Sequence, residues 1–389
     1  MLLIKGGTIY SPEKLGIKDI IIAGGKIEAI ADDINIGMSN ISLDVIDASS
    51  HIVVPGFIDS HVHLIGGGGE GGYSTRTPEI QLTQITTSGI TTVVGCLGTD
   101  GVTRSMASLI AKARALEEEG ISAYCYTGSY DVPVRSLMKT PKEDIIMIDK
   151  IIGIGEIAIV DHRSSQPTIE ALKGIIADAR VGGILSGKAG IVNIHMGDGE
   201  RLLSDLIEII NTTELPITQI IPTHTNRSLR LFDNSIEFAL MGGYVDLTTS
   251  SDPQHLDEDE VKASTGLKRL LEAGVKIDLI GFSSDAQGSL PIFNNKRELV
   301  GLGIGSTKSL FREVRDAILQ EGLRIEEAIK VITSNPARML KLSKKGIIDR
   351  GMDGDLVLLK SDTLEIDTVI AMGKVMVEKG RPVVKGTFE

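Results

Sequence analysis

The chain has 389 residues, of which 42% are hydrophobic and 24% are charged, a balance typical of water-soluble globular proteins. Its formal net charge is −12, and the sequence has no long run of lysine or arginine. This charge argues against nucleic acid or an anionic membrane as a partner, because both require a basic surface. The length exceeds that of one ordinary hydrophobic core, so we expect one large and one smaller domain.

The sequence shows no pattern of export or membrane insertion. Its first residues, MLLIKGGTIY, lack the charged region followed by an apolar one that marks a signal peptide, and no apolar stretch is long enough to span a bilayer. The two cysteines, Cys96 and Cys125, lie in apolar segments without a CxxC motif. We interpret them as buried free thiols in a reducing compartment, which predicts a cytoplasmic protein.

Strand-forming residues dominate both ends of the chain. Short apolar runs bounded by turn residues occur at 1–10, 17–23, 26–30 and 45–47, and again at 355–358 and 369–377. We therefore expect residues 1–54 and 345–389 to form one small β-sandwich domain.

In residues 55–344, strand-like and helical segments alternate. The strand-like segments lie at 89–95, 121–127, 157–160, 190–195, 217–224, 243–247 and 277–282, and helical ones lie at 103–119, 168–181, 201–211, 228–241 and 257–273. Short strands that alternate with helices indicate a parallel sheet. About eight such units suit a closed (β/α)8 barrel better than an open sheet.

The pair His61 and His63 is the first candidate metal site. Alternate residues of a strand face the same side, so both imidazoles point into one space, as two ligands of one ion must. An isolated HxH is more often two unrelated polar residues. Here it ends an apolar strand and precedes four glycines and Glu70, which favours the metal site.

Three further side chains follow predicted barrel strands. His195, His224 and Asp285 each stand at the C-terminal end of an apolar run, where barrel active sites form. One such histidine alone would be structural, and an aspartate there could merely cap a turn or a helix. Together with HxH they predict a metal site in which Asp285 handles a proton. We expect the remaining histidines, His51, His162 and His255, to have no part in it.

The order HxH, His, His, Asp on a barrel with a split β-domain resembles the amidohydrolase superfamily. Longer segments resemble the isoaspartyl dipeptidase family, and the similarity runs nearly from end to end. These segments are HVHLIGGGGE at 61–70, DHR at 161–163, HMGD at 195–198, PTHTNR at 222–227, SSDAQGS at 283–289 and VKGTFE at 384–389.

The resemblance implies hydrolysis of β-aspartyl dipeptides by two zinc ions and a hydroxide that they activate. It implies that His61, His63 and Asp285 bind one ion and that His195 and His224 bind the other. The substrate-binding residues that it implies are Glu70 for the α-ammonium, Arg163 and Arg227 for carboxylates, and Gly68, Thr99 and Ser289 for further polar contacts. It implies a catalytic role for Tyr130, which would polarise the scissile carbonyl or stabilise the oxyanion. Guanidinium groups suit carboxylates because they bind them in a bidentate manner. The family also implies a homo-oligomer, an octamer.

Glu156 departs from the family pattern, which has a carboxylated lysine there as the bridge between the metals. A carbamate and a glutamate are both carboxylates, but the glutamate arm is shorter by about 3–4 Å. A bulge at Gly155 could bring the backbone closer. We expect Glu156 to bridge two ions; the alternative is that it only forms an ion pair near a single metal.

Two other classes of function remain open. One is a different amidohydrolase reaction, on a cyclic amide as in dihydroorotase or hydantoinase, or on an N-acyl amino acid. Glu70, Arg163 and Arg227 favour a substrate with free amino acid ends instead. The other is a non-catalytic assembly protein on the same fold, a class that typically lacks metal ligands which this sequence retains.

Overall fold

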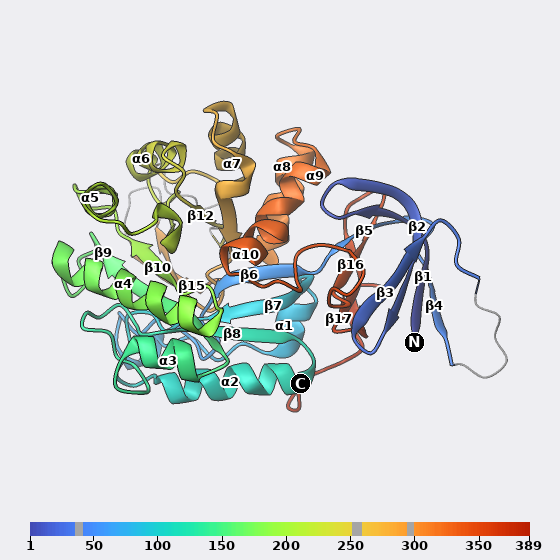
Figure 1. Cartoon of the computed structure of the whole chain (residues 1–389), viewed down its shortest axis with the longest axis horizontal. Helices are drawn as coiled ribbons and strands as arrows, with labels where there is room; N and C mark the ends of the chain where they lie inside the picture. The colour runs from blue at the N-terminus through green and yellow to red at the C-terminus, as the bar shows by residue number, and fades with distance from the viewer. Residues whose placement is uncertain (36–41, 251–258, 294–298) are drawn as a thin grey trace.

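The computed structural model describes residues 1–35, 42–250, 259–293 and 299–389. Figure 1 shows a strand-rich part built from both ends of the chain beside a larger part in which helices surround a barrel of strands. The mixed α/β fold expected from the sequence is confirmed.

Strands from both ends of the chain form one nine-stranded sheet. Its strands are β1 (Leu2–Tyr10), β2 (Lys14–Ala23), β3 (Lys26–Ala31), β4 (Asp44–Asp47), β5 (His51–Pro55), β16 (Leu356–Lys360), β17 (Ile366–Ala371), β18 (Lys374–Glu378) and β19 (Arg381–Pro382). The two ends meet where β5 pairs antiparallel with β16, from Pro55 opposite Leu356 to His51 opposite Lys360. Buried aliphatic side chains from both ends, such as Ile4 and Leu358, share one core.

Eight parallel strands of the described residues form the barrel. They are β6 (Phe57–Val62), β7 (Ile90–Gly95), β8 (Ser122–Thr127), β9 (Ile151–Ile159), β10 (Ile191–Met196), β11 (Ile220–Thr223), β12 (Val245–Thr248) and β13 (Ile280–Ser283). β6 to β11 pair in chain order, and β12 pairs with β13. The amide of Thr225 bonds to the carbonyl of Asp246 at 3.2 Å, and a parallel bridge joins Val62 to Ala286. These links join the last strands to β11 and β6 and close the ring.

The helices lie outside the barrel (Figure 1). They are α1 (Leu82–Thr86), α2 (Met106–Glu119), α3 (Pro141–Met147), α4 (Ile169–Ser186), α5 (Ser204–Thr212), α6 (Leu229–Leu240), α7 (Ala263–Glu272), α8 (Lys308–Leu319), α9 (Ile325–Ala328) and α10 (Ser334–Met339), with a hairpin of β14 (Ser289–Phe293) and β15 (Leu299–Ile304) before α8. Several of them begin at a residue whose side-chain hydroxyl caps the helix. The Ser105 hydroxyl of α2 and the Thr168 hydroxyl of α4 each accept a hydrogen bond from the backbone amide three residues later. None of the helices in the described ranges is both long and apolar enough to cross a membrane.

Some predicted boundaries differ from the structure. The segments predicted as strands from 217 and from 277 begin with 3-10 turns, η2 (Ile217–Gln219) and η3 (Ile277–Leu279). The helix predicted from 257 begins at Ala263, and 257–258 lie outside the described residues. Short 3-10 turns carry the same apolar side chains as the strand that follows, so the hydrophobic pattern does not separate them.

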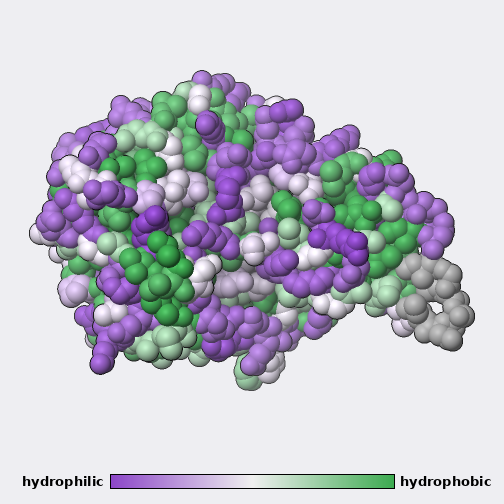
Figure 2. All heavy atoms as spheres, viewed as in Figure 1, coloured by the Kyte–Doolittle hydropathy of each residue, from purple (hydrophilic) through white to green (hydrophobic). Residues whose placement is uncertain are grey.

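The molecular surface is mostly hydrophilic in the view of Figure 2, with hydrophobic side chains gathered over α4. Val181, Ile184 and Leu185 of that helix are 42%, 61% and 67% exposed. Their spacing of three and four residues places them on one face of the helix.

Candidate active site

The six predicted metal ligands converge on one end of the barrel. His61 lies in β6, Glu156 in β9 and His195 in β10. His63 and His224 directly follow the ends of β6 and β11, and Asp285 stands two residues after the end of β13. Parallel strands of a barrel end on the same face, so these side chains meet there. Five of the six side chains are at most 7% exposed, whereas that of Asp285 is 17% exposed.

Glu156 lies at the centre of this cluster. Its Oε2 atom lies 3.0 Å from His195 Nδ1, 3.5 Å from His61 Nε2 and 3.6 Å from His224 Nε2. Its Oε1 atom lies 3.5 Å from His63 Nε2. One carboxylate therefore faces all four histidines.

A bulge in β9 accounts for this central position. Val192 and Ile194 of β10 pair with Ile154 and Ile157 of β9, so β9 carries one extra residue between them. Gly155 has φ +153°, and a Cβ atom on it would lie 2.9 Å from both Cβ and O of Asn193. The backbone approach that holds Glu156 therefore requires glycine at this position.

Asp285 completes the cluster from the opposite side. Its Oδ1 atom lies 3.0 Å from His63 Nε2 and 3.6 Å from His61 Nε2. Its φ is +52°, and that of His224 is +61°, both in the left-handed region that costs energy for residues with a side chain. A hydrogen bond of 3.1 Å from the Asp285 amide to the His61 carbonyl helps to hold this conformation.

Polar side chains surround His195. The Tyr130 hydroxyl lies 2.8 Å from His195 Nδ1, and Asp161 Oδ2 lies 3.1 Å from His195 Nε2. Arg163 donates to both oxygens of Asp161, at 2.9 and 2.7 Å. Arg227 Nη1 lies 3.2 Å from His195 Nε2. The two arginines predicted to bind carboxylates thus stand at the edge of the histidine cluster.

The predicted ammonium-binding residue, Glu70, lies on the same rim. It accepts a hydrogen bond of 2.9 Å from Thr99 and lies 3.6 Å from Arg163 Nη1. Gly68 lies close to Ser289, since a Cβ atom on Gly68 would lie 3.2 Å from Ser289 Cβ. The other eleven predicted residues thus form one connected set, and Gly68 and Ser289 stand two residues before Glu70 and four residues after Asp285.

The other histidines lie elsewhere. His51 Nε2 lies 3.6 Å from Asp367 Oδ2 in the terminal sheet. The His162 side chain is 89% exposed. His255 lies outside the described residues.

The cluster favours anionic carboxylates. Burial raises the pKa of Glu156, but the charge of His61 and the hydrogen bonds of His195 and His224 together hold it well below its usual range. Burial likewise raises the pKa of Asp285, and the neighbouring His63, His224 and His61 lower it by more. Burial lowers the pKa of His224 to about 3, which keeps its imidazole neutral. The two carboxylates and His224 are thus in the ionisation states that bind metals.

The donor set fits divalent cations. Three buried atoms of the cluster have no hydrogen-bond partner among the described residues. They are both ring nitrogens of His61 and Oδ1 of Asp285. Buried polar atoms of this kind require a partner. Glu156, His195 and His224 form one group of close donor atoms, and His61, His63 and Glu156 belong to another. Nitrogen and carboxylate donors at this spacing suit zinc.

The sequence interpretation missed two residues of the site. Cys96, interpreted only as a buried thiol, is buried, but its Sγ atom lies 3.8 Å from His63 Nδ1. Its place directly after β7, at the same end of the barrel as the histidines, was a usable signal. Asp161 had no assigned role, yet it pairs with Arg163 and His195. No sequence pattern identifies such a partner.

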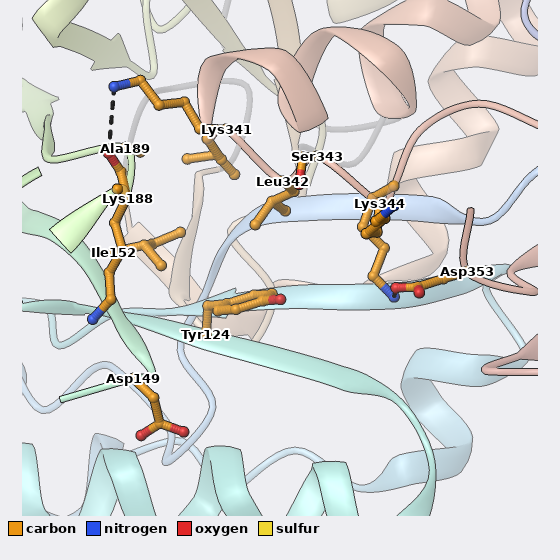
Figure 3. A pocket seen from close by; sticks show the side chains of 13 residues that line it. Tyr124, Asp149, Ile152, Lys188, Ala189, Lys341, Leu342, Ser343, Lys344 and Asp353 are labelled. Carbon is orange, nitrogen blue, oxygen red and sulfur yellow. Dashed lines mark hydrogen bonds and ion pairs between the residues drawn. The ribbon is translucent and has the colours of Figure 1, made fainter. Parts of the chain in front are cut away.

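A separate pocket lies at the other ends of the strands. It is lined by Tyr124 near the start of β8, Ile152 near the start of β9, and the segment 340–345 after α10. Figure 3 shows lysines and Asp353 around it. Lys345 is already bonded to Asp355 at 2.6 Å and to Asp353 at 2.8 Å. The histidine cluster is not part of this pocket.

The amidohydrolase family model matches residues 52–376 of the chain. The chain belongs to the amidohydrolase family. It is 45% identical to a beta-aspartyl dipeptidase from Fervidobacterium islandicum AW-1 in complex with beta-Asp-Leu, over 98% of this chain and 97% of that one, with a TM-score of 0.91. These findings confirm the family resemblance noted in the sequence.

More distant similarities also extend over almost the whole chain. Dihydropyrimidinase from Brevibacillus agri NCHU1002 is 16% identical over 99% of this chain and 96% of that one, with a TM-score of 0.70. A 5-methylthioadenosine/S-adenosylhomocysteine deaminase from Carboxydothermus hydrogenoformans is 24% identical over 97% of this chain and 93% of the relative.

Proposed function

We propose that this amidohydrolase hydrolyses the isopeptide bond of β-aspartyl dipeptides. The observation that carries the proposal is the buried cluster of four histidines around Glu156, with Glu70, Arg163 and Arg227 on its rim. The 45% identity to a beta-aspartyl dipeptidase supports it.

Two zinc ions per subunit are the proposed cofactors. His61, His63 and Asp285 would hold one, His195 and His224 the other, and Glu156 would bridge them. The short distances from Glu156 to histidines of both pairs support this division. Bound zinc lowers the pKa of water and polarises carbonyl groups as a Lewis acid.

Asp285 is the proposed proton carrier. It would take a proton from the attacking water and deliver it to the leaving amine. Its side chain is the most exposed of the six, 17% against 1% for Glu156, so it faces the open side of the cluster. Its lowered pKa keeps it ionised and able to accept a proton.

Tyr130 is proposed to donate a hydrogen bond to the carbonyl oxygen as negative charge develops there. Burial and the nearby charge of Glu156 raise the pKa of Tyr130 well above its ordinary value, so the phenol retains its proton. Its hydroxyl already lies 2.8 Å from His195, beside the cluster.

Substrate selection is proposed to depend on charge. Glu70 would bind the α-ammonium group, while Arg163 and Arg227 would bind the carboxylates. Thr99 holds Glu70 through its 2.9 Å hydrogen bond, and Gly68 and Ser289 would add polar contacts. An N-acyl amino acid or a cyclic amide lacks the ammonium group that Glu70 would meet.

We also propose a cytoplasmic homo-oligomer, an octamer as the family resemblance implies. The exposed apolar face of Val181, Ile184 and Leu185 on α4 supports association of subunits.

The zinc-loaded protein should be assayed on β-Asp-Leu, α-linked Asp-Leu, N-acetyl-β-Asp-Leu and an N-acyl amino acid. We expect turnover of β-Asp-Leu, weak turnover of the α-linked isomer and none after N-acetylation. Faster hydrolysis of the N-acyl amino acid would replace the dipeptidase assignment with a deacylase.

A further inference from the structure

Cys96 is a buried thiol beside the HxH pair of His61 and His63. Its amide donates a 3.0 Å hydrogen bond to the carbonyl of Val62, the residue between His61 and His63. This bond fixes the end of β7 against the end of β6. The Cys96 side chain is fully buried, and its Sγ atom lies 3.8 Å from His63 Nδ1.

Four donor groups are gathered around this point. One atom each of His61, His63, Cys96 and Glu156 lies within 4.8 Å of every other, and all four residues are buried. The His61 and His63 Nε2 atoms each lie 3.5 Å from a Glu156 oxygen. Donor atoms of a tetrahedral zinc site lie about 3.3–3.6 Å apart, given zinc–nitrogen distances of about 2.0 Å and zinc–sulfur distances of about 2.3 Å.

A second observation points to a ligand at the same place. Both ring nitrogens of His61 are buried and, within the described ranges, neither has a hydrogen-bond partner. A buried imidazole without a partner is costly unless something absent from the protein chain binds it. The Cys96 thiol belongs to the same group of close donor atoms as this imidazole.

We propose that Cys96 is a ligand of the metal ion held by His61 and His63, so that this ion has a sulfur donor besides nitrogen and oxygen. The inference rests on the metal site of the proposed function, but not on its substrate. Sulfur is a soft donor that favours zinc or cobalt over magnesium and manganese. The site therefore selects for a borderline or soft cation.

Cys125 provides a matched control. It is also a fully buried thiol near the end of a barrel strand, β8. Its Sγ atom instead lies 3.9 Å from the carbonyl of Leu109 in α2, on the outer side of the barrel. Cys125→Ser and Cys96→Ser thus make the same chemical change at two buried sites.

The test is zinc-edge X-ray absorption of the zinc-loaded protein, together with zinc content and β-Asp-Leu activity. We expect one sulfur neighbour per two zinc ions, at about 2.3 Å, in the parent and in Cys125→Ser, and none in Cys96→Ser. Cys96→Ser should also bind one of its ions at least about 10-fold more weakly. Cobalt-loaded protein should show the same contrast through a thiolate-to-cobalt band in the near ultraviolet.

A parent protein whose zinc has only nitrogen and oxygen neighbours, and whose cobalt form lacks the thiolate band, would overturn the proposal. Cys96 would then be only a hydrogen-bond partner of His63. If sulfur is found but β-Asp-Leu is not hydrolysed, the ligand assignment stands and the dipeptidase function fails.

Discussion

The Oε2 atom of Glu156 lies 3.0 Å from Nδ1 of His195, although glutamate has a shorter arm than the carboxylated lysine expected at this position. The bulge in β9 brings its backbone toward the barrel axis and so makes the shorter arm sufficient. The same carboxylate also faces His61 and His63 at 3.5 Å. This geometry predicts a bridge that needs no added carbon dioxide.

Apo-protein should therefore regain full activity with zinc alone in carbon-dioxide-free buffer. Glu156→Gln keeps the size but removes the negative charge between two cations, and a neutral amide does not offset their repulsion. We expect this variant to lose at least one zinc ion per subunit and most of its activity. Two zinc ions and an unchanged rate in Glu156→Gln would show that Glu156 does not bridge.

The Asp285→Asn variant tests whether Asp285 carries the proton from the attacking water to the leaving amine. The amide does not accept and return a proton, so kcat on β-Asp-Leu should fall by at least ~10²-fold, the scale of general acid–base catalysis. The other five ligands remain, so most of the zinc should stay bound. Steady-state kinetics must be paired with a zinc assay on the same sample. Near-normal turnover by the zinc-loaded variant would remove Asp285 from this role.

Gly155→Ala tests the backbone that positions Glu156. The added Cβ atom would lie 2.9 Å from Cβ and O of Asn193, so β9 must move away from β10 and carry Glu156 with it. We expect lower zinc content and lower activity. Gly174→Ala in α4 is the control, because a Cβ atom there meets nothing within 4 Å and alanine favours a helix. Equal zinc content in the two variants would contradict the positional role of Gly155.

The meeting of His195, His224 and Asp285 in one cluster follows from one simple rule, so it could be predicted from the sequence. His195 lies near the end of an apolar strand, His224 and Asp285 each follow one, and parallel strands of a barrel end on one face. The same rule places Cys96 and Asp161 at this end of the barrel, but it does not say which ligand each of them contacts. Asp161 meets His195 only because β9 and β10 are neighbours, and Cys96 meets His63 because β7 lies beside β6. Contacts between side chains of neighbouring strands depend on how the strands pair, and the local sequence of one strand does not determine this register.

Asp246, inside the barrel, makes the stability of the metal-free protein depend on pH. Its Oδ2 atom accepts hydrogen bonds from Thr223 at 2.6 Å and from Ser283 at 2.5 Å. Burial nevertheless raises the pKa of Asp246 to about 6, from 3.8. The folded state therefore binds this proton more tightly than the unfolded state, and the contribution of Asp246 to stability falls as pH rises from about 4 to about 6.

Asp246→Asn removes this titration while keeping an oxygen acceptor. The free energy of unfolding of the variant, minus that of the parent, should increase by about 2.4 kcal/mol between pH 4 and pH 7, at about 1.4 kcal/mol per pKa unit, because the unfolded carboxyl is already half ionised near pH 4. Urea unfolding of both chelator-treated proteins at several pH values measures this difference. The difference between the two proteins cancels the contributions of the other carboxylates to the free energy of unfolding, because these groups titrate equally in both. A difference that stays constant with pH would mean that Asp246 is as easily ionised in the folded barrel as in the unfolded chain.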